Sequence, residues 1–338
     1  MNDVEKINIR VPKKIGTQLD NDAKLFEILK KDGRTINRNA FLSMLLLGYY
    51  NTYSLERQEK SNVILELLKS DLPKEKCKEI CEILLKKVVL PVVPSRKGKN
   101  PVRLSLKPTK NTESLITSIS NEIGVEDSFS QYFCRMLMSY CQKPLPERER
   151  IIFKNNYEIL SNACKRQRPI MFSTIWNKNA VHIVIPYRLD IGKEELFNYL
   201  LCAETNPNTG KQEAKSYRLN RITGINYANI DNRIDNTILY YLDEMSRLGA
   251  PYSINDSEIS RVQLTEKGLA SLKRIYYGRP QDITIRKTEN GYDCDIKGSK
   301  DQVFQYFRRF GEDAEIISPK ELRNRLVEFH QKATEKYT

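Results

Sequence analysis

The first residues of the chain place cationic and amide side chains at every second position. Within 4–11, Lys6, Asn8 and Arg10 alternate with Glu5, Ile7, Ile9 and Val11, and Pro12 follows. Since successive side chains of a β-strand point to opposite faces, this alternation predicts a strand with one apolar face and one basic face. A basic face of this kind favours binding of a polyanion over covalent chemistry.

A second basic stretch lies between Pro91 and Lys110. It contains no acidic residue, and alternation within it places Val102, Leu104 and Leu106 opposite polar side chains. Its cationic residues are Arg96, Lys97, Lys99, Arg103, Lys107 and Lys110. The pattern predicts another half-buried basic strand.

The sequence offers little support for catalysis. It contains no Walker loop, no GxSxG, no HExxH and no convincing pair of carboxylates. Its two histidines, His182 and His330, are far apart, so we expect neither a catalytic triad nor a histidine-based metal centre. We therefore expect no enzyme, no catalytic residues, no metal and no cofactor. A nuclease built from scattered acidic residues is the least favoured alternative.

The overall composition favours an acidic partner. Lys and Arg number 56 against 43 Asp and Glu, which gives a net charge of +13 and a pI of about 9.2. The seven cysteines include no CxxC pair, which is typical of a reducing compartment. No apolar run reaches the about 18 residues of a membrane span, and 1–10 is unlike a signal peptide. We expect a cytoplasmic protein without a membrane partner.

Two predicted helices follow the first strand. The first carries apolar residues from Leu19 to Leu29, Asp32-Gly33 interrupts the pattern, and the second helix begins near Asn37. This strand-helix-helix order over 1–50 resembles the ribbon-helix-helix DNA-binding fold. The resemblance implies that Lys6, Asn8 and Arg10 read the major groove. Asn37 and Arg38 would hold a phosphate at the start of the second helix; alternatively, all five side chains are simply solvated.

The same pattern recurs over 91–143, where a possible second ribbon-helix-helix-like unit has helices lined by Leu115 to Ile123 and by Phe129 to Tyr140. Because a lone strand leaves its edge unpaired, the two strands are expected to pair within one chain. The alternative pairs 4–11 with its equivalent in another subunit of a homodimer. Residues 51–90 are predicted to form two connecting helices, one on each side of Pro73.

A small β-barrel is predicted over 144–229. A helix over 148–165 precedes five short strands, at 170–176, 181–190, 196–204, 213–219 and 223–227. Three of these segments, IVIPYRL (183–189), FNYLLCAE (197–204) and KSYRLNRI (215–222), resemble the WYL-domain pattern in order and spacing. The resemblance implies an Sm-like five-stranded barrel with a basic pocket for nucleic acid or another anionic ligand.

The family's Trp-Tyr-Leu corresponds here to Asn198-Tyr199-Leu200. The resemblance implies that Tyr199, Lys215 and Arg221 contact the ligand, and the further candidates are Arg218, His182, Arg188 and Trp176. Cations would hold phosphates, and an aromatic ring would stack on a base. Taken singly, Tyr199 is also consistent with a core tyrosine, and the alternation of Lys215 and Tyr217 with a half-solvated strand.

Residues 230–338 predict a linker helix and then a ferredoxin-like βαββαβ domain, with a hairpin at Asn290-Gly291. Residues 303–329 resemble the WCX-like extension that accompanies many WYL domains, which implies dimerisation or closure over the ligand. Phe304, Phe307 and Phe310 have the spacing of a helix face, which fits either an interface or, more often, a core. The fold class is therefore α+β and multidomain.

This order of domains resembles the WYL accessory proteins of type VI-D CRISPR-Cas systems. The resemblance implies a non-catalytic protein that binds single-stranded RNA and stimulates an RNA-guided, RNA-cleaving effector ribonuclease. The alternative is a transcriptional regulator in which the ribbon binds DNA and the barrel senses a ligand. The alternation of Lys6, Asn8 and Arg10 favours that alternative.

Overall fold

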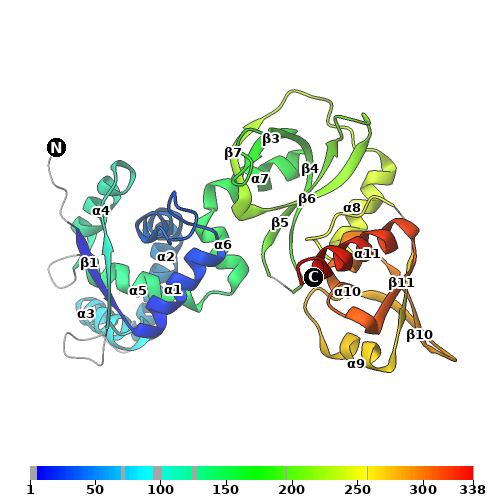
Figure 1. Cartoon of the computed structure of the whole chain (residues 1–338). Coiled ribbons are helices and arrows are strands. Elements are labelled where there is room, and N and C mark those ends of the chain that lie inside the picture. Colours follow the sequence, from blue (N-terminus) through cyan, green and yellow to red (C-terminus); the bar gives the residue numbers. More distant parts are fainter. Residues whose placement is uncertain are drawn as a thin grey trace. The chain divides into compact units, whose positions relative to one another are not determined.

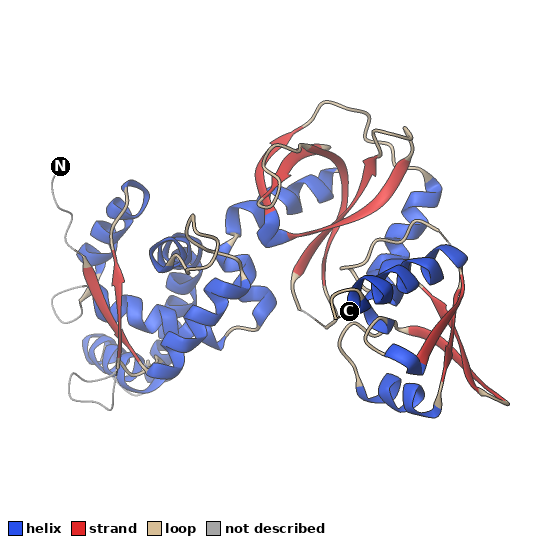
Figure 2. Ribbon diagram, in the orientation of Figure 1, coloured by secondary structure: helices blue, strands red, loops and turns tan. Residues whose placement is uncertain are grey.

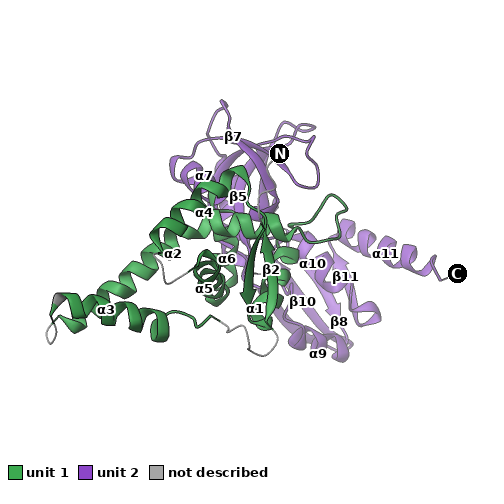
Figure 3. Cartoon of the chain, turned by 90° about the vertical axis from the view of Figure 1, so that its left-hand side faces the viewer, with its two compact units in different colours: residues 1–155 green, residues 156–338 purple. Residues whose placement is uncertain are grey.

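The computed structural model describes residues 6–69, 73–93, 101–123, 128–194, 196–256 and 258–337. The chain divides into two compact units, Met1–Asn155 and Asn156–Thr338 (Figure 3). Helices and antiparallel sheets occur together, as expected for an α+β protein. None of the helices in the described ranges is both long and apolar enough to cross a membrane.

A two-stranded ribbon lies on one side of the first unit (Figure 1). β1 (Ile7–Val11) pairs antiparallel with β2 (Val102–Leu106), so the strand pairing predicted within one chain is present. Ile9, Val11, Leu104 and Leu106 are buried, whereas the side chains between them are exposed. The ribbon therefore has one apolar face against the helices and one polar face toward solvent.

Each ribbon strand is followed by two helices. These are α1 (Lys13–Leu25) and α2 (Arg38–Leu68) after β1, and α4 (Lys110–Glu122) and α5 (Phe129–Gln142) after β2. Asn37 caps α2 by accepting a hydrogen bond from the Ala40 backbone N–H at 3.1 Å. Ser128 and Gln131 form a capping box at the start of α5.

α2 is longer than the sequence pattern predicts. The expectation of a separate connecting helix before Pro73 is wrong, because α2 runs without a break through to Leu68. No glycine or proline lies between Tyr49 and Leu68 to end it. The helix expected after Pro73 is present as α3 (Lys74–Leu84), followed by a π-turn at Leu85–Val89.

The helix expected over 148–165 is two helices, α6 (Leu145–Ile152) and α7 (Lys154–Arg166). Phe153 leaves helical geometry between them, at φ −106° and ψ 34°. Its ring contacts that of Phe26 edge to face, with centroids 6.0 Å apart. The break in the helical pattern thus coincides with this ring contact, and α6 belongs to the first unit.

The five strands predicted in the second unit are present and form one strongly curled sheet (Figure 2). They are β3 (Ile170–Thr174), β4 (His182–Ile191), β5 (Asn198–Thr205), β6 (Gln212–Arg218) and β7 (Ile222–Tyr227), in the order β6-β5-β4-β3-β7. The expectation of a closed barrel is wrong for the described residues, since β6 and β7 are the two edges of the sheet. A 3₁₀ turn at Leu219–Arg221 carries the chain away from β6, and β7 pairs with β3.

The rest of the second unit begins with α8 (Asn236–Leu248), which contacts β5 and β6 and ends at Gly249. The predicted order βαββαβ follows as β8 (Ser260–Leu264), α9 (Glu266–Arg274), β9 (Asp282–Thr288), β10 (Gly291–Lys297), α10 (Lys300–Phe307) and β11 (Ala314–Ser318), and α11 (Lys320–Thr334) ends it. The sheet order is β11-β8-β10-β9. Phe304, Phe307 and Phe310 are buried in its core, so the core interpretation of this aromatic stripe is confirmed.

Candidate nucleic-acid interfaces

The solvent face of the ribbon carries two pairs of opposed polar residues. Asn8 lies opposite Ser105, and Arg10 lies opposite Arg103. The Asn8 side-chain oxygen accepts hydrogen bonds from Arg103 Nε at 2.9 Å and from Ser105 Oγ at 3.0 Å. Asn8 therefore orients a cation of the neighbouring strand, a role that the alternation of β1 alone does not reveal.

Arg10 and Arg103 are like charges placed directly across the ribbon. Such a pair destabilises a sheet by about 0.2–1 kcal/mol unless an anion lies nearby. Within the part of the chain that the structure describes, Lys6, Arg10 and Lys107 make no ion pair. Lys6 and Lys107 flank the paired strands, so the described part of this face carries several cations that make no ion pair with other described residues. A phosphate backbone would supply the missing negative charge.

The other two residues predicted for this region have partners within the chain. Asn37 caps its own helix, and Arg38 forms a two-pronged ion pair with Asp20 at 2.6 and 2.7 Å. The hydrogen bond to Asp20 raises the pKa of Arg38. The start of α2 is thus held to α1 by these side chains, and its cation is already paired.

The structure does not bring Tyr199 and Lys215 together. Tyr199 lies opposite Arg218 in the β5–β6 pair, whereas Lys215 lies opposite Cys202. Tyr199 and Cys202 are three residues apart on one strand, so their side chains point to opposite faces of the sheet. Tyr199 is also only 8% exposed. Assigning Tyr199 to β5 and Lys215 to β6 from the sequence could not reveal this separation, because it depends on the register between the two strands.

Several of the remaining predicted side chains have contacts within the second unit. Lys215 Nζ lies 2.6 Å from Glu213 Oε2, and this contact is the largest cause of the lowered pKa of Glu213. The Arg218 guanidinium lies 3.1 Å from the centre of the Phe197 ring. Arg188 donates to the Ser246 hydroxyl of α8 at 3.0 Å.

His182 belongs to a three-membered polar cluster at the end of β4. Its Nδ1 lies 2.8 Å from Glu204 Oε1 and 2.9 Å from the Tyr217 hydroxyl, which itself donates to Glu204 at 2.5 Å. Burial and the adjacent Glu204 raise the pKa of Tyr217 well above its ordinary value. The cluster ties β4, β5 and β6 together, and its groups are mutually satisfied.

Arg221 and Trp176 form a cation-aromatic contact in which the aromatic ring is exposed. The Arg221 guanidinium carbon lies 5.0 Å from the centre of the Trp176 ring. A backbone hydrogen bond of 3.0 Å from Ile175 N–H to the Arg221 carbonyl holds the two segments together. Trp176, the single tryptophan of the chain, is 73% exposed. An indole ring in this position can stack on an unpaired base while the guanidinium contacts phosphate.

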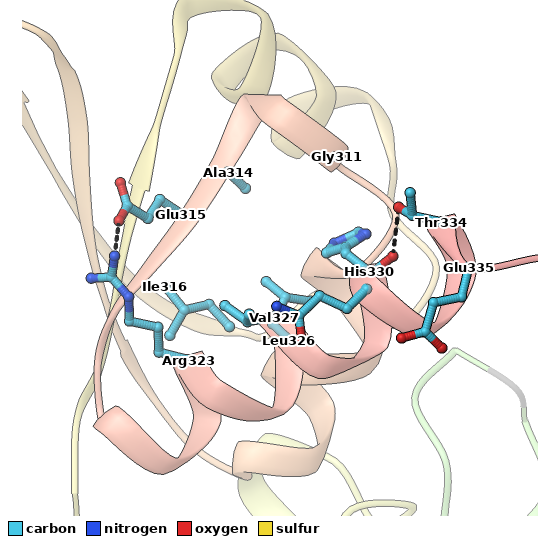
Figure 4. A pocket seen from close by; sticks show the side chains of 11 residues that line it. Gly311, Ala314, Glu315, Ile316, Arg323, Leu326, Val327, His330, Thr334 and Glu335 are labelled. Atoms are coloured by element: carbon cyan, nitrogen blue, oxygen red, sulfur yellow. Dashed lines mark hydrogen bonds and ion pairs between the residues drawn. The ribbon is translucent and has the colours of Figure 1, made fainter. Parts of the chain in front are cut away.

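A hollow of about 800 Å³ lies between β11 and α11 (Figure 4). Ile316, Leu326 and Val327 give it apolar walls, and its Arg323 is ion-paired with Glu315 at 2.6 Å. Glu335 adds a second carboxylate to its lining, so the hollow does not resemble a phosphate-binding surface. Among the described residues, no three His, Cys, Asp or Glu side chains form a group that could hold a metal ion.

These features define a class of protein: a basic α+β chain of two units, with one cationic ribbon and one curled sheet that carries an exposed aromatic-cation pair. The fold is shared with the crystal structure of a CRISPR Cas-related protein, at a TM-score of 0.65 and 20% identity, over 98% of this chain and 94% of that one. Proteasome accessory factor B/C of Arthrobacter aurescens gives a TM-score of only 0.23 at 12% identity, over 78% of this chain and 44% of that one. No protein-family model matches the chain, and no curated protein sequence matches it.

Proposed function

We propose that this chain is a non-catalytic accessory protein of a CRISPR system that binds single-stranded RNA and stimulates an RNA-guided effector ribonuclease in the cytoplasm. The proposal includes a ribbon-helix-helix origin for the first unit and a WYL-type, Sm-like origin for the curled sheet. It also includes a WCX-like C-terminal region and a homodimer. Its support is the resemblance of the sequence segments to the WYL family, together with a fold shared with a CRISPR Cas-related protein over nearly the whole chain.

The observation that carries the RNA-binding proposal is the exposed Trp176 ring beside Arg221. Bases of an unpaired strand are available for stacking, and each base-aromatic contact contributes about 1–3 kcal/mol. Bases inside a duplex are already stacked on their neighbours, so the same ring discriminates against double-stranded nucleic acid. Arg221 supplies a cation that can contact the phosphate next to the stacked base.

Affinity for labelled single-stranded RNA tests this proposal through two charge-matched variants. Arg221→Ala should weaken binding about ten-fold, since it removes the cation beside the stacking ring. Lys215→Ala removes the same charge from a residue that Glu213 already neutralises, and should change affinity by less than about two-fold. Equal affinities for the Arg221 variant and the unaltered chain would remove the proposed site.

The effect on an effector is a separate measurement. The rate of RNA cleavage by an RNA-guided effector ribonuclease would be measured in three reactions. One contains the unaltered chain, one contains the Arg221→Ala variant, and one contains the effector alone. We expect the unaltered chain to raise the cleavage rate and the variant to raise it less. Cleavage of RNA by the chain alone, in the presence of divalent metal ions, would contradict the non-catalytic assignment.

A second function, a DNA-binding transcriptional regulator, is favoured by the ribbon. A two-stranded ribbon can enter the major groove, and Arg10 and Arg103 face solvent on adjacent strands. This function requires specific duplex affinity that depends on the ribbon cations. Comparison of duplex DNA and single-stranded RNA at one salt concentration, with Arg10→Ala and Arg221→Ala, separates the two functions.

A further inference from the structure

A hollow of about 430 Å³ lies between the end of α7 and the loop after β7 in the second unit, and its lining includes neither Trp176 nor Arg221. Its polar walls come from Arg166, Arg168, Tyr227, Asn229 and Asn232, and none of the described residues that line it carries a carboxylate. Arg166 and Arg168 make no ion pair within the described residues. The hollow therefore has an excess of positive charge and several hydrogen-bond donors, which suit a phosphate-bearing ligand.

Arg168 is held in place by an aromatic ring. Its guanidinium carbon lies 3.8 Å from the centre of the Tyr227 ring. The ring covers one face of the guanidinium and leaves the N–H donors at its edge, the geometry in which arginine binds phosphate through two parallel hydrogen bonds. Tyr227 itself is 41% exposed.

The backbone around Arg168 is fixed before any ligand arrives. The N–H groups of Gln167 and Arg168 donate to carbonyls of the last turn of α7, at 3.2 and 3.0 Å. Gln167 has a φ of +46°, a left-handed conformation that costs energy for a residue with a side chain. The Ala228 N–H donates to the Pro169 carbonyl at 2.9 Å and joins the two walls of the hollow. Such preorganisation lowers the entropy lost on binding.

The hollow and the Trp176–Arg221 pair lie at opposite ends of one strand pair. Ile170 lies opposite Tyr227, and Thr174, two residues before Trp176, lies opposite Ile222. Four residue steps of about 3.3 Å separate these ends by about 13 Å. Since β7 is an edge of the sheet, both ends of this pair lie at the same sheet edge.

We propose that the Arg168–Tyr227 hollow is a second contact for the same single RNA strand, at which Arg166 and Arg168 hold a backbone phosphate. This inference rests on the proposed RNA-binding function. It makes the edge formed by β3 and β7, rather than the surface around Tyr199, the path of the strand. A strand that reaches both ends is bound more tightly than one that occupies the Trp176 end alone.

Affinity for single-stranded RNA oligonucleotides of increasing length, each measured over a salt series, tests the second contact. Arg168→Ala should leave binding of the shortest oligonucleotides unchanged and weaken binding of the longer ones about ten-fold. The slope of log affinity against log salt should fall by about 0.7 for each phosphate that the variant no longer binds. Tyr227→Phe keeps the ring and should bind like the unaltered chain, whereas Tyr227→Ala should resemble Arg168→Ala.

The control Arg323→Ala removes one charge from α11, where no RNA contact is proposed, and should leave both affinity and slope unchanged. If Arg168→Ala has the same affinity and salt slope as the unaltered chain while Arg221→Ala is weakened, the second contact is wrong and the proposed function stands. If the unaltered chain does not bind single-stranded RNA, both are wrong. Thermal unfolding of each variant checks that weaker binding does not arise from unfolding of the variant.

Discussion

Single cations differ in this protein by whether a carboxylate lies beside them. Arg38 and Lys215 have Asp20 and Glu213 at 2.6 Å. Arg10 and Arg168 make no such contact within the described part of the chain, and Arg168 instead lies over an aromatic ring. A cation already paired with a carboxylate gains less from a phosphate than one without such a partner. Arg10 and Arg168 are therefore the better guides to where a polyanion binds.

The buried ion pair of the first unit yields a prediction about stability. Asp22, 1% exposed, accepts hydrogen bonds from Arg148 at 2.7 Å and from the Tyr140 hydroxyl at 2.9 Å. Arg148→Ala would leave a buried carboxylate without its counter-ion, and should lower the free energy of unfolding by about 3–5 kcal/mol. Urea denaturation measures this loss. Adding Asp22→Asn to Arg148→Ala should recover part of it.

The loss caused by Arg148→Ala should also depend on pH. Burial raises the pKa of Asp22 even with Arg148 present, and removal of Arg148 should raise it further. Since the folded state then binds the proton more tightly than the unfolded state, stability increases as pH falls through the raised pKa. The difference in the free energy of unfolding between the variant and the unaltered chain should therefore narrow as the pH falls through the raised pKa of Asp22 in the variant. A constant difference would show that Asp22 is not the group left unpaired.

Four thiols should resist modification in the folded chain. Burial raises the pKa of Cys134 and Cys294 to about 11 and that of Cys141 and Cys164 to about 12. Because the thiolate is the reactive form, these cysteines should stay unlabelled by a disulfide reagent at about pH 8 until denaturant is added. Mass spectrometry of peptides from the labelled protein identifies each site. Rapid labelling of Cys134 without denaturant would contradict its burial.

At the scale of helices and strands, the sequence was sufficient where one local pattern decides the outcome. Alternation predicted β1 and β2, and the apolar face and edge of each strand predicted their pairing. The absence of glycine and proline between Tyr49 and Leu68 is a local signal for the unbroken length of α2. The break at Phe153 coincides instead with a ring contact to Phe26, which no local pattern shows. The separation of Tyr199 from Lys215 depends on strand register, so the predicted pocket could not be tested before the strands were paired.

The contact between α2 and α6 allows a sharp test of the packing. A Cβ atom at Gly48 would lie 1.9 Å from the Ile151 carbonyl oxygen, a backbone atom that cannot move alone. Gly48→Ala should therefore destabilise the chain by about 1–3 kcal/mol, although alanine has the higher helix propensity. Gly33→Ala at the exposed Gly33 would place its Cβ in open space, with no atom within 4 Å. Because Gly33 has a φ of +66°, that variant tests backbone strain rather than packing. A Gly48 variant as stable as the unaltered chain would contradict the close contact.

The ribbon should show opposite effects on stability and on binding. Arg10→Ala removes one of two like charges that face each other, and should raise the free energy of unfolding or leave it unchanged. The same change should weaken binding to any polyanion that the ribbon holds, and reduce the salt dependence of that binding. Arg38→Ala is the control, because its charge is paired with Asp20 and it should lose stability without losing binding.

For the whole molecule, the net charge of +13 is distributed over two units, each with its own candidate surface for a polyanion. The ribbon suits a duplex groove, and the sheet edge with Trp176 suits an unpaired strand. The fold shared with a CRISPR Cas-related protein spans both units. Which nucleic acid is preferred decides between the two proposed functions.

The fluorescence of the single tryptophan measures this preference most directly, since Trp176 is itself the proposed stacking ring. Titration with single-stranded RNA should quench the emission to saturation, and Arg221→Ala should shift the midpoint to about ten-fold higher RNA concentration. Duplex DNA at the same salt concentration should quench little. Emission that stays unchanged while RNA binding is detected by another method would contradict a site at Trp176.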